Sequence, residues 1–173
     1  MEIMIIVLLL ASLLGIWTLS VRRRLEAQET NIRNAMNQTL VHLSAEREAL
    51  VALADLLENS IDAQHYREIK RYLELLQNSR EESLPEKVAR QQEIMLRVQK
   101  MIAESSEQKP LLQAQETYQK YWKAANSYDH MVKTSSLIYN DSVESFNRML
   151  CKMPDRLAAG ICGFHQKKCL EIM

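Results

Sequence analysis

The chain has 173 residues and a formal net charge of zero, because 22 Lys and Arg residues balance 22 Asp and Glu residues. Three glycines and three prolines are too few for a turn-rich sandwich or barrel, and the chain has no glycine-rich phosphate-binding motif. Neutrality argues against nucleic-acid binding, and three cysteines do not make a secreted disulfide framework. We therefore expect one all-α protein, not an enzyme, with no cofactor and no small-molecule substrate.

The N-terminal segment 3–21 contains 19 successive residues without a charge. As a helix it would rise about 28 Å, close to the ~30 Å hydrocarbon thickness of a bilayer. A cleaved signal peptide fits less well, because no Lys or Arg precedes the run and no small-residue cleavage site follows it. We predict a transmembrane anchor over residues 1–21 that contacts the lipid bilayer through residues 3–21.

Three arginines, Arg22, Arg23 and Arg24, follow the anchor directly, whereas Glu2 is the only charged side chain before it. Basic residues beside a first transmembrane helix favour the cytoplasmic side. This topology signal predicts a single-pass protein of the cell (inner) membrane. Its short N-terminus would lie outside and its body in the cytoplasm.

The segment from Arg22 to about Glu58 has no glycine or proline, so we predict that the anchor continues directly into the first helix of the body. Apolar residues there recur three and four apart, and Arg47 takes one place in this stripe. An arginine in such a stripe needs a partner, and we expect Glu116 or Glu144 to supply it. The apolar positions are Ile32, Met36, Leu40, Leu43, Leu50, Ala54, Leu57 and Ile61.

Two shorter helices are predicted in the middle of the body. The sequence Asn59-Ser60-Ile61-Asp62 indicates a stop and a new N-cap. Ser83 and Glu86 have capping-box spacing, and Pro85 suits a first helical turn. The first of these helices would place Tyr66, Ile69, Leu73 and Leu76 on one face, and the second Val88, Met95, Val98 and Ile102. A polar turn over 105–109 precedes Pro110.

The last predicted helix, residues 111–153, has the most regular heptad pattern. Its positions are Leu111, Ala114, Tyr118, Tyr121, Ala125, Tyr128, Val132, Ser135, Tyr139, Ser142, Phe146, Met149 and Met153. Such a repeat needs a partner helix, and the first body helix is the expected antiparallel one. The predicted fold is an N-terminal transmembrane helix that continues into an elongated antiparallel helical bundle over 22–153, with a tail over 154–173. The same heptads could instead pack between copies of the chain, so a homo-oligomer is a second prediction.

The C-terminal region carries the most specific motif. Tyr139-Asn140 is followed by Phe146-Asn147, then by Pro154 and by Gly163-Phe164. This pattern resembles the signature of the bacterial LemA family.

The N-terminal half matches more loosely, through Leu43, Arg47 and Leu50, which resemble the Leu-xxx-Arg-xx-Leu motif of that family. Where the family continues with an Ile-Pro-Asn-Leu-Val-like segment, this chain has residues 51–54 without a proline, which predicts a straighter helix. The resemblance implies an anchored antiparallel bundle with an external N-terminus and no established catalytic activity.

Asn140 and Asn147 lie seven residues apart and so share a helix face. We expect each to bond to a neighbouring helix or to the chain after Pro154, rather than to a substrate, because a buried amide needs partners. The tail after Pro154 has two interpretations. It folds back on the bundle, which we favour, or its apolar residues with Arg156, Lys167 and Lys168 contact the bilayer. Those apolar residues are Leu157, Ile161, Phe164, Leu170 and Ile172.

Four residues near the C-terminus, Cys151, Cys162, His165 and Cys169, are of types that bind zinc. Their spacing is not that of a known zinc motif, and buried cysteine often acts as a small apolar side chain, so we predict no metal site. The expected function is a non-catalytic membrane-anchored scaffold that binds unidentified proteins or its own copies at the cytoplasmic face. The alternatives are a membrane-shaping or stress-sensing protein with a bilayer-contacting tail, and a zinc- or thiol-dependent protein.

Overall fold

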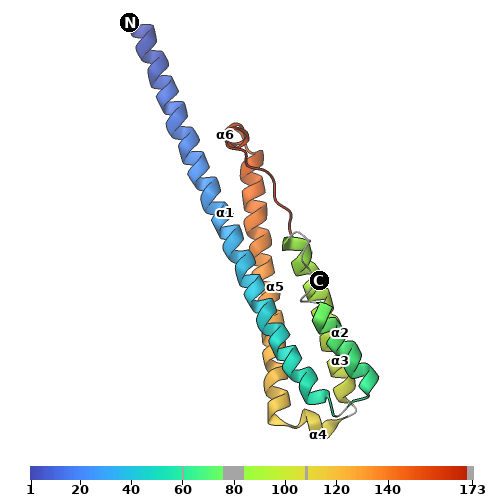
Figure 1. Cartoon of the computed structure of the whole chain (residues 1–173). Helices are drawn as coiled ribbons and strands as arrows, with labels where there is room; N and C mark the ends of the chain where they lie inside the picture. The colour runs from blue at the N-terminus through green and yellow to red at the C-terminus, as the bar shows by residue number, and fades with distance from the viewer. Residues whose placement is uncertain (60, 76–83, 108, 171–173) are drawn as a thin grey trace. The chain divides into compact units, whose positions relative to one another are not determined.

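The structure, a computed structural model, describes residues 1–59, 61–75, 84–107 and 109–170. Within these residues it contains helices and no strand, which confirms the all-α prediction (Figure 1). The helices are α1 (Glu2–Leu57), α2 (Ala63–Leu75), α3 (Leu84–Glu107), α4 (Pro110–Gln113), α5 (Glu116–Cys151) and α6 (Asp155–Ile161). The predicted features at Ser60, Leu76, Ser83 and Ile172 lie outside the described residues.

The chain divides into two compact units, each of which contains part of α1 and part of α5. The first unit holds residues 1–35 and 139–169, and the second holds 36–138 together with Leu170.

The long helix α1 includes both the apolar N-terminal run and the first body helix, as predicted. No glycine or proline lies between Gly15 and its last residue, Leu57, so no residue in that stretch breaks the backbone hydrogen bonding. Every side chain from Met1 to Ile16 is exposed, and Val21 is the first that is buried. Among the described residues, α1 is the one helix long and apolar enough to span a membrane, with a mean hydropathy of 2.5 over an 18-residue window.

The buried stripe of α1 differs from the predicted one at its charged position. Side chains are buried at regular intervals of three and four residues, at Met36, Thr39, Leu43, Glu46, Leu50, Leu53 and Leu57. Glu46, only 3 % exposed, therefore takes the place that the sequence analysis gave to Arg47, which is half-buried at the side of the stripe. A shift of one residue turns a helical side chain by about 100°, which is enough to exchange the two roles.

The second unit has a continuous apolar core to which α1, α2, α3, α4 and α5 all contribute. Its buried members are Ala49, Leu50, Leu53, Ala54, Leu57, Ile69, Leu73, Met95, Val98, Ile102, Leu112, Tyr118 and Ala125. Polar contacts join the same helices at the surface: Lys70 Nζ lies 2.6 Å from Asp55 Oδ1, and Gln99 Nε2 donates to Asn126 Oδ1 at 2.6 Å. Asp62 accepts a hydrogen bond from the backbone N–H of Gln64, which confirms the predicted N-cap of α2.

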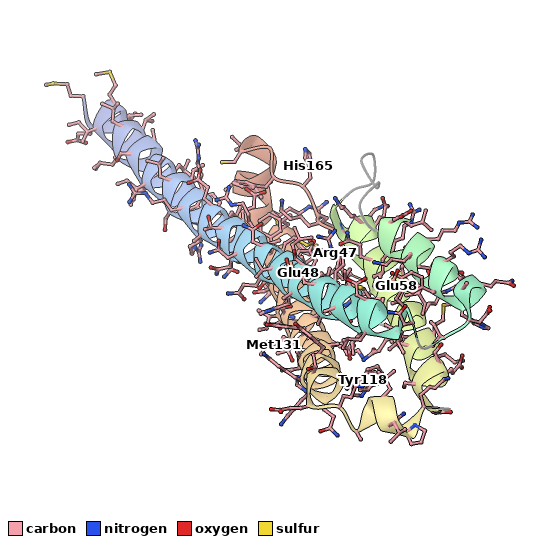
Figure 2. The ribbon with its side chains drawn as sticks, turned by 60° about the horizontal axis from the view of Figure 1, so that its bottom comes forward. Arg47, Glu48, Glu58, Tyr118, Met131 and His165 are labelled. Carbon is pink, nitrogen blue, oxygen red and sulfur yellow. The ribbon has the colours of Figure 1, made fainter. Side chains whose placement is uncertain are left out.

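The predicted helix over 111–153 is wrong at its start. The chain turns at Ala114 and Gln115, which separates the four-residue α4 from α5. Leu111, the first predicted heptad position, is 86 % exposed, so its agreement with the pattern is coincidental. The pattern holds from Tyr118 onward, where buried residues recur every seven positions at Tyr118, Ala125, Val132, Tyr139 and Phe146. Tyr118 lies at the start of α5, and its hydroxyl donates to Ser106 Oγ of α3 at 2.8 Å (Figure 2).

Candidate functional site

The predicted motif residues of α5 hold the chain that follows α6. Asn147 makes two hydrogen bonds to the backbone of Lys167: its Nδ2 donates to the carbonyl oxygen at 2.8 Å, and its Oδ1 accepts from the N–H at 2.9 Å. The Tyr139 hydroxyl donates to the carbonyl oxygen of Lys168 at 3.1 Å. The prediction that an asparagine of this pair bonds to the chain after Pro154 is therefore confirmed for Asn147. Asn140 lies half-buried on α5.

The Gly163-Phe164 part of the motif turns the chain back toward α5. Gly163 has a φ of +75°, in the region that favours glycine. The N–H of Gly163 donates to the carbonyl oxygen of Gly160, and the N–H of Phe164 donates to the carbonyl oxygen of Ala159. These are the two hydrogen bonds of a Schellman cap. The turn directs Phe164 against Phe146, with ring centroids 6.2 Å apart and planes at 73°. Residues 164–169 therefore dock on the helices, as the favoured interpretation of the tail predicted.

Two ion pairs join α1 to this C-terminal region within the first unit. Arg24 Nη2 lies 3.4 Å from Asp155 Oδ1 at the start of α6, and Lys167 Nζ lies 2.5 Å from Glu29 Oε1. Of the three predicted topology arginines, Arg22 pairs with Glu26 on the same helix at 2.7 Å. One of these pairs thus links α1 to α6, and the other links α1 to the segment that follows α6.

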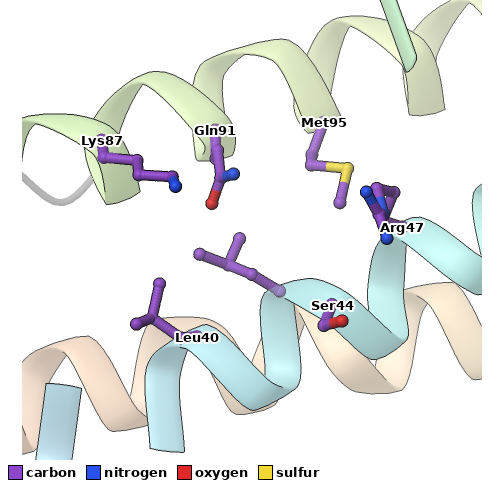
Figure 3. A pocket seen from close by; sticks show the side chains of 7 residues that line it. Leu40, Ser44, Arg47, Lys87, Gln91 and Met95 are labelled. Atoms are coloured by element: carbon purple, nitrogen blue, oxygen red, sulfur yellow. The ribbon is translucent and has the colours of Figure 1, made fainter. Parts of the chain in front are cut away.

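A groove of about 340 Å³ lies between α1 and α3 in the second unit (Figure 3). Leu40, Leu43 and Met95 supply its apolar surface, and Ser44, Arg47, Lys87 and Gln91 supply its polar groups. The Lys87 and Gln91 side chains extend from α3 toward α1, and Arg47 lies beside Met95 (Figure 3). Two cations beside an apolar floor suit a ligand that combines carboxylates with apolar side chains.

The structure places Arg47 in a different setting from the predicted ion pair. Its side chain lines the groove and a neighbouring pocket of about 460 Å³ between α1 and α2. The ion pairs found among the described residues include none from Arg47 to Glu116 or Glu144. Leu43 and Leu50, the other residues of that motif, are buried in the second unit. Arg47 is thus at the groove surface rather than inside the bundle.

The buried carboxyl of the second unit belongs to Glu46. Burial is the main cause that raises its pKa, to about 8, and the negative charge of Asp129 adds to the effect. Lys133 lowers the pKa, but this lysine also lies 3.0 Å from Asp129 Oδ2. Glu46 is therefore mainly protonated at pH 7.

The four possible zinc ligands are not gathered into one site. Among the residues that the structure describes, no group of three or more His, Cys, Asp or Glu side chains is arranged to hold a metal ion. Cys151 and Cys169 are exposed, Cys162 is half-buried, and all three are free thiols. His165 is exposed on the segment that follows α6 (Figure 2).

Sequence reasoning missed Lys87 and Glu46. Lys87 is one of many charged residues on an amphipathic helix, and its place in the groove depends on how α3 packs against α1. Glu46 had a local signal, because it lies three residues after Leu43 and four before Leu50. A strict heptad count through Leu43, Leu50 and Leu57 finds it.

The family model of the LemA family matches residues 20–173 of the 173-residue chain. No curated protein matches the chain.

Proposed function

The chain belongs to the LemA family, and on that premise we propose that it is a non-catalytic, single-pass membrane scaffold whose cytoplasmic helical body binds other proteins. Residues 3–21 of α1 form the anchor, and Arg22, Arg23 and Arg24 set the orientation. The binding site is the groove between α1 and α3, and its partner is an acidic, amphipathic segment of another protein.

The arrangement of the groove carries this proposal. Arg47 and Lys87 offer two cations for carboxylates of the partner, while Leu40, which is partly exposed above the buried Leu43 and Met95, offers apolar contact. Peptide segments dock on helical proteins in this way, with apolar anchors in a groove and charged side chains at its rim. Glu48, Asp55 and Glu74 line the adjacent pocket, so the acidic part of the partner lies over Arg47 and Lys87 and away from α2.

Photo-crosslinking in cells tests the proposal. A photo-reactive amino acid replaces Ser44, which is exposed and lines the groove, and a matched one replaces Thr134, which is exposed on α5. We expect an adduct from position 44 that mass spectrometry maps to an acidic segment of another protein, and none from position 134. The adduct disappears when Arg47→Glu and Lys87→Glu are combined, and it persists in Lys123→Glu, a charge reversal on α5.

Two results would contradict the proposal. Equal crosslinking from positions 44 and 134 would show that partner proteins do not bind at the groove in preference to the rest of the surface. An adduct that contains only a second copy of this chain would replace the scaffold for other proteins with self-assembly. Thermal unfolding of the double variant checks that its fold is intact.

A further inference from the structure

Helix α6 has an exposed apolar face. Leu157 is 58 % exposed and Ile161 is 80 % exposed. The two side chains lie four residues apart and so project from the same side of the helix. Met153, just before α6, is also exposed. Three large apolar side chains that are exposed within nine residues are unusual for the surface of a soluble domain.

The opposite face of α6 is held within the first unit. Ala158 and Ala159 are buried, Asp155 pairs with Arg24, and the Schellman cap at Gly163 ends the helix. These contacts fix which side of α6 is exposed. The apolar face therefore has a defined direction relative to α1 in the same unit.

The position of α6 along α1 brings it to the end of the anchor. The apolar run ends at Val21, and Arg24, which pairs with Asp155, lies three residues later, about 5 Å along the helix axis. In Figure 1, α6 follows the C-terminal end of α5. The exposed side chains of Lys152 and Arg156 add positive charge beside the apolar face.

We propose that α6 lies on the bilayer surface on the body side of the membrane, with Leu157 and Ile161 inserted at the boundary between headgroups and acyl chains. This inference rests on the membrane anchor in the proposed function. A helix at this boundary buries its apolar face in lipid while its basic side chains contact anionic headgroups. Lys152 and Arg156, both exposed, are the cations that lie nearest to this face in the sequence.

Most of the tail after α6 is engaged by the protein and not by the bilayer. Phe164 packs against Phe146, Leu170 is 4 % exposed, and Lys167 pairs with Glu29. These side chains are engaged by the protein itself. The apolar contact with the membrane is therefore restricted to α6 and Met153, while the segment after Gly163 serves to hold α6 in place.

Depth-dependent fluorescence quenching tests the placement in the full chain. The three cysteines become serine, and Leu157→Cys or Ile161→Cys carries an environment-sensitive fluorophore in vesicles of phosphatidylcholine and phosphatidylglycerol. Leu10→Cys in the anchor and Glu144→Cys on the exposed side of α5 are matched controls. We expect a nitroxide lipid with its quencher near the headgroups to remove most of the emission at 157 and 161 and little at 144.

The outcomes separate this inference from the anchor on which it rests. If a deep nitroxide quenches the label at 10 while the labels at 157 and 161 behave like that at 144, the anchor stands and the inference fails. If the labels at 157 and 161 are shielded from aqueous iodide but not quenched by either lipid, protein covers α6 and the inference also fails. If the label at 10 is not quenched, both fail. Unchanged thermal unfolding of the labelled chains confirms that the fold is retained.

Discussion

Replacing Glu46 with glutamine removes the one acidic side chain that is buried in the described core. Glutamine has almost the size and shape of a protonated glutamic acid but never binds the titrating proton. In the native chain this carboxyl, which is 3 % exposed to water, must stay protonated or bring a negative charge next to Asp129. The substitution therefore separates the free-energy cost of keeping the carboxyl protonated from any change in packing.

The expected magnitude follows from the pKa. Glu46 changes from an ordinary pKa of 4.5 to about 8 in the folded chain, so between these values the folded state holds a proton that the unfolded state has released. This contribution to stability is fully present below pH 4.5 and is lost as the pH rises toward 8. Each pH unit is worth about 1.4 kcal/mol, so at pH 7 Glu46→Gln gains about 3 kcal/mol in the free energy of unfolding, and near pH 4.5 it gains almost nothing.

Denaturant unfolding from pH 4.5 to 8, followed by circular dichroism of the detergent-solubilised full chain, measures this difference. Glu48→Gln is the matched control, because Glu48 is exposed two residues further along α1 (Figure 2). The increase in the free energy of unfolding caused by Glu46→Gln must grow with pH, while the change caused by Glu48→Gln stays near zero. Parallel stability curves for the native chain and Glu46→Gln would refute the assignment of a protonated carboxyl at this position.

Three further substitutions test the C-terminal region and the groove. Asn147→Ala leaves the backbone N–H and C=O of Lys167 without their partner and should cost about 1–3 kcal/mol by thermal unfolding, with faster tryptic cleavage after Lys167 than in Glu144→Ala. Gly163→Ala should cost about 1 kcal/mol, because a Cβ is strained at a φ of +75°; an unchanged melting temperature would argue against the Schellman cap. Arg47→Met should change stability by less than about 0.5 kcal/mol or raise it, and a clear loss would reveal an ion pair on which the fold depends.

The sequence predicted the helices well because their signals are local. The uncharged run, the absence of glycine and proline in the first body helix, and the Asp62 cap each act within a few residues, and all three agree with the structure. The buried heptad of α5 from Tyr118 to Phe146 was also visible as a period. The break between α4 and α5 could not be predicted from this period, because Leu111 and Ala114 fit it by chance.

The candidate site was harder to predict because it depends on packing between helices. The sequence showed that Asn147 needs partners, but only the turn at Gly163 places the backbone of Lys167 beside it. Arg47 was singled out for a buried ion pair, yet it lies at a groove whose second cation, Lys87, is forty residues away in the chain. The acidic residue with the perturbed pKa is its immediate neighbour, so a one-residue error in the helix phase assigned a buried cation where the structure buries a carboxyl that is mainly protonated at pH 7.

The hydrogen bonds from the Asn147 side chain to main-chain atoms have an evolutionary consequence. Both of its hydrogen bonds end on the peptide groups of Lys167, so they accept any residue type there except proline, which lacks the N–H. The number of residues between the Gly163 turn and position 167 is, by contrast, fixed by the span that the chain must cover. Relatives of this protein should therefore tolerate substitutions at 165–168 while rejecting single-residue insertions and deletions in the same segment.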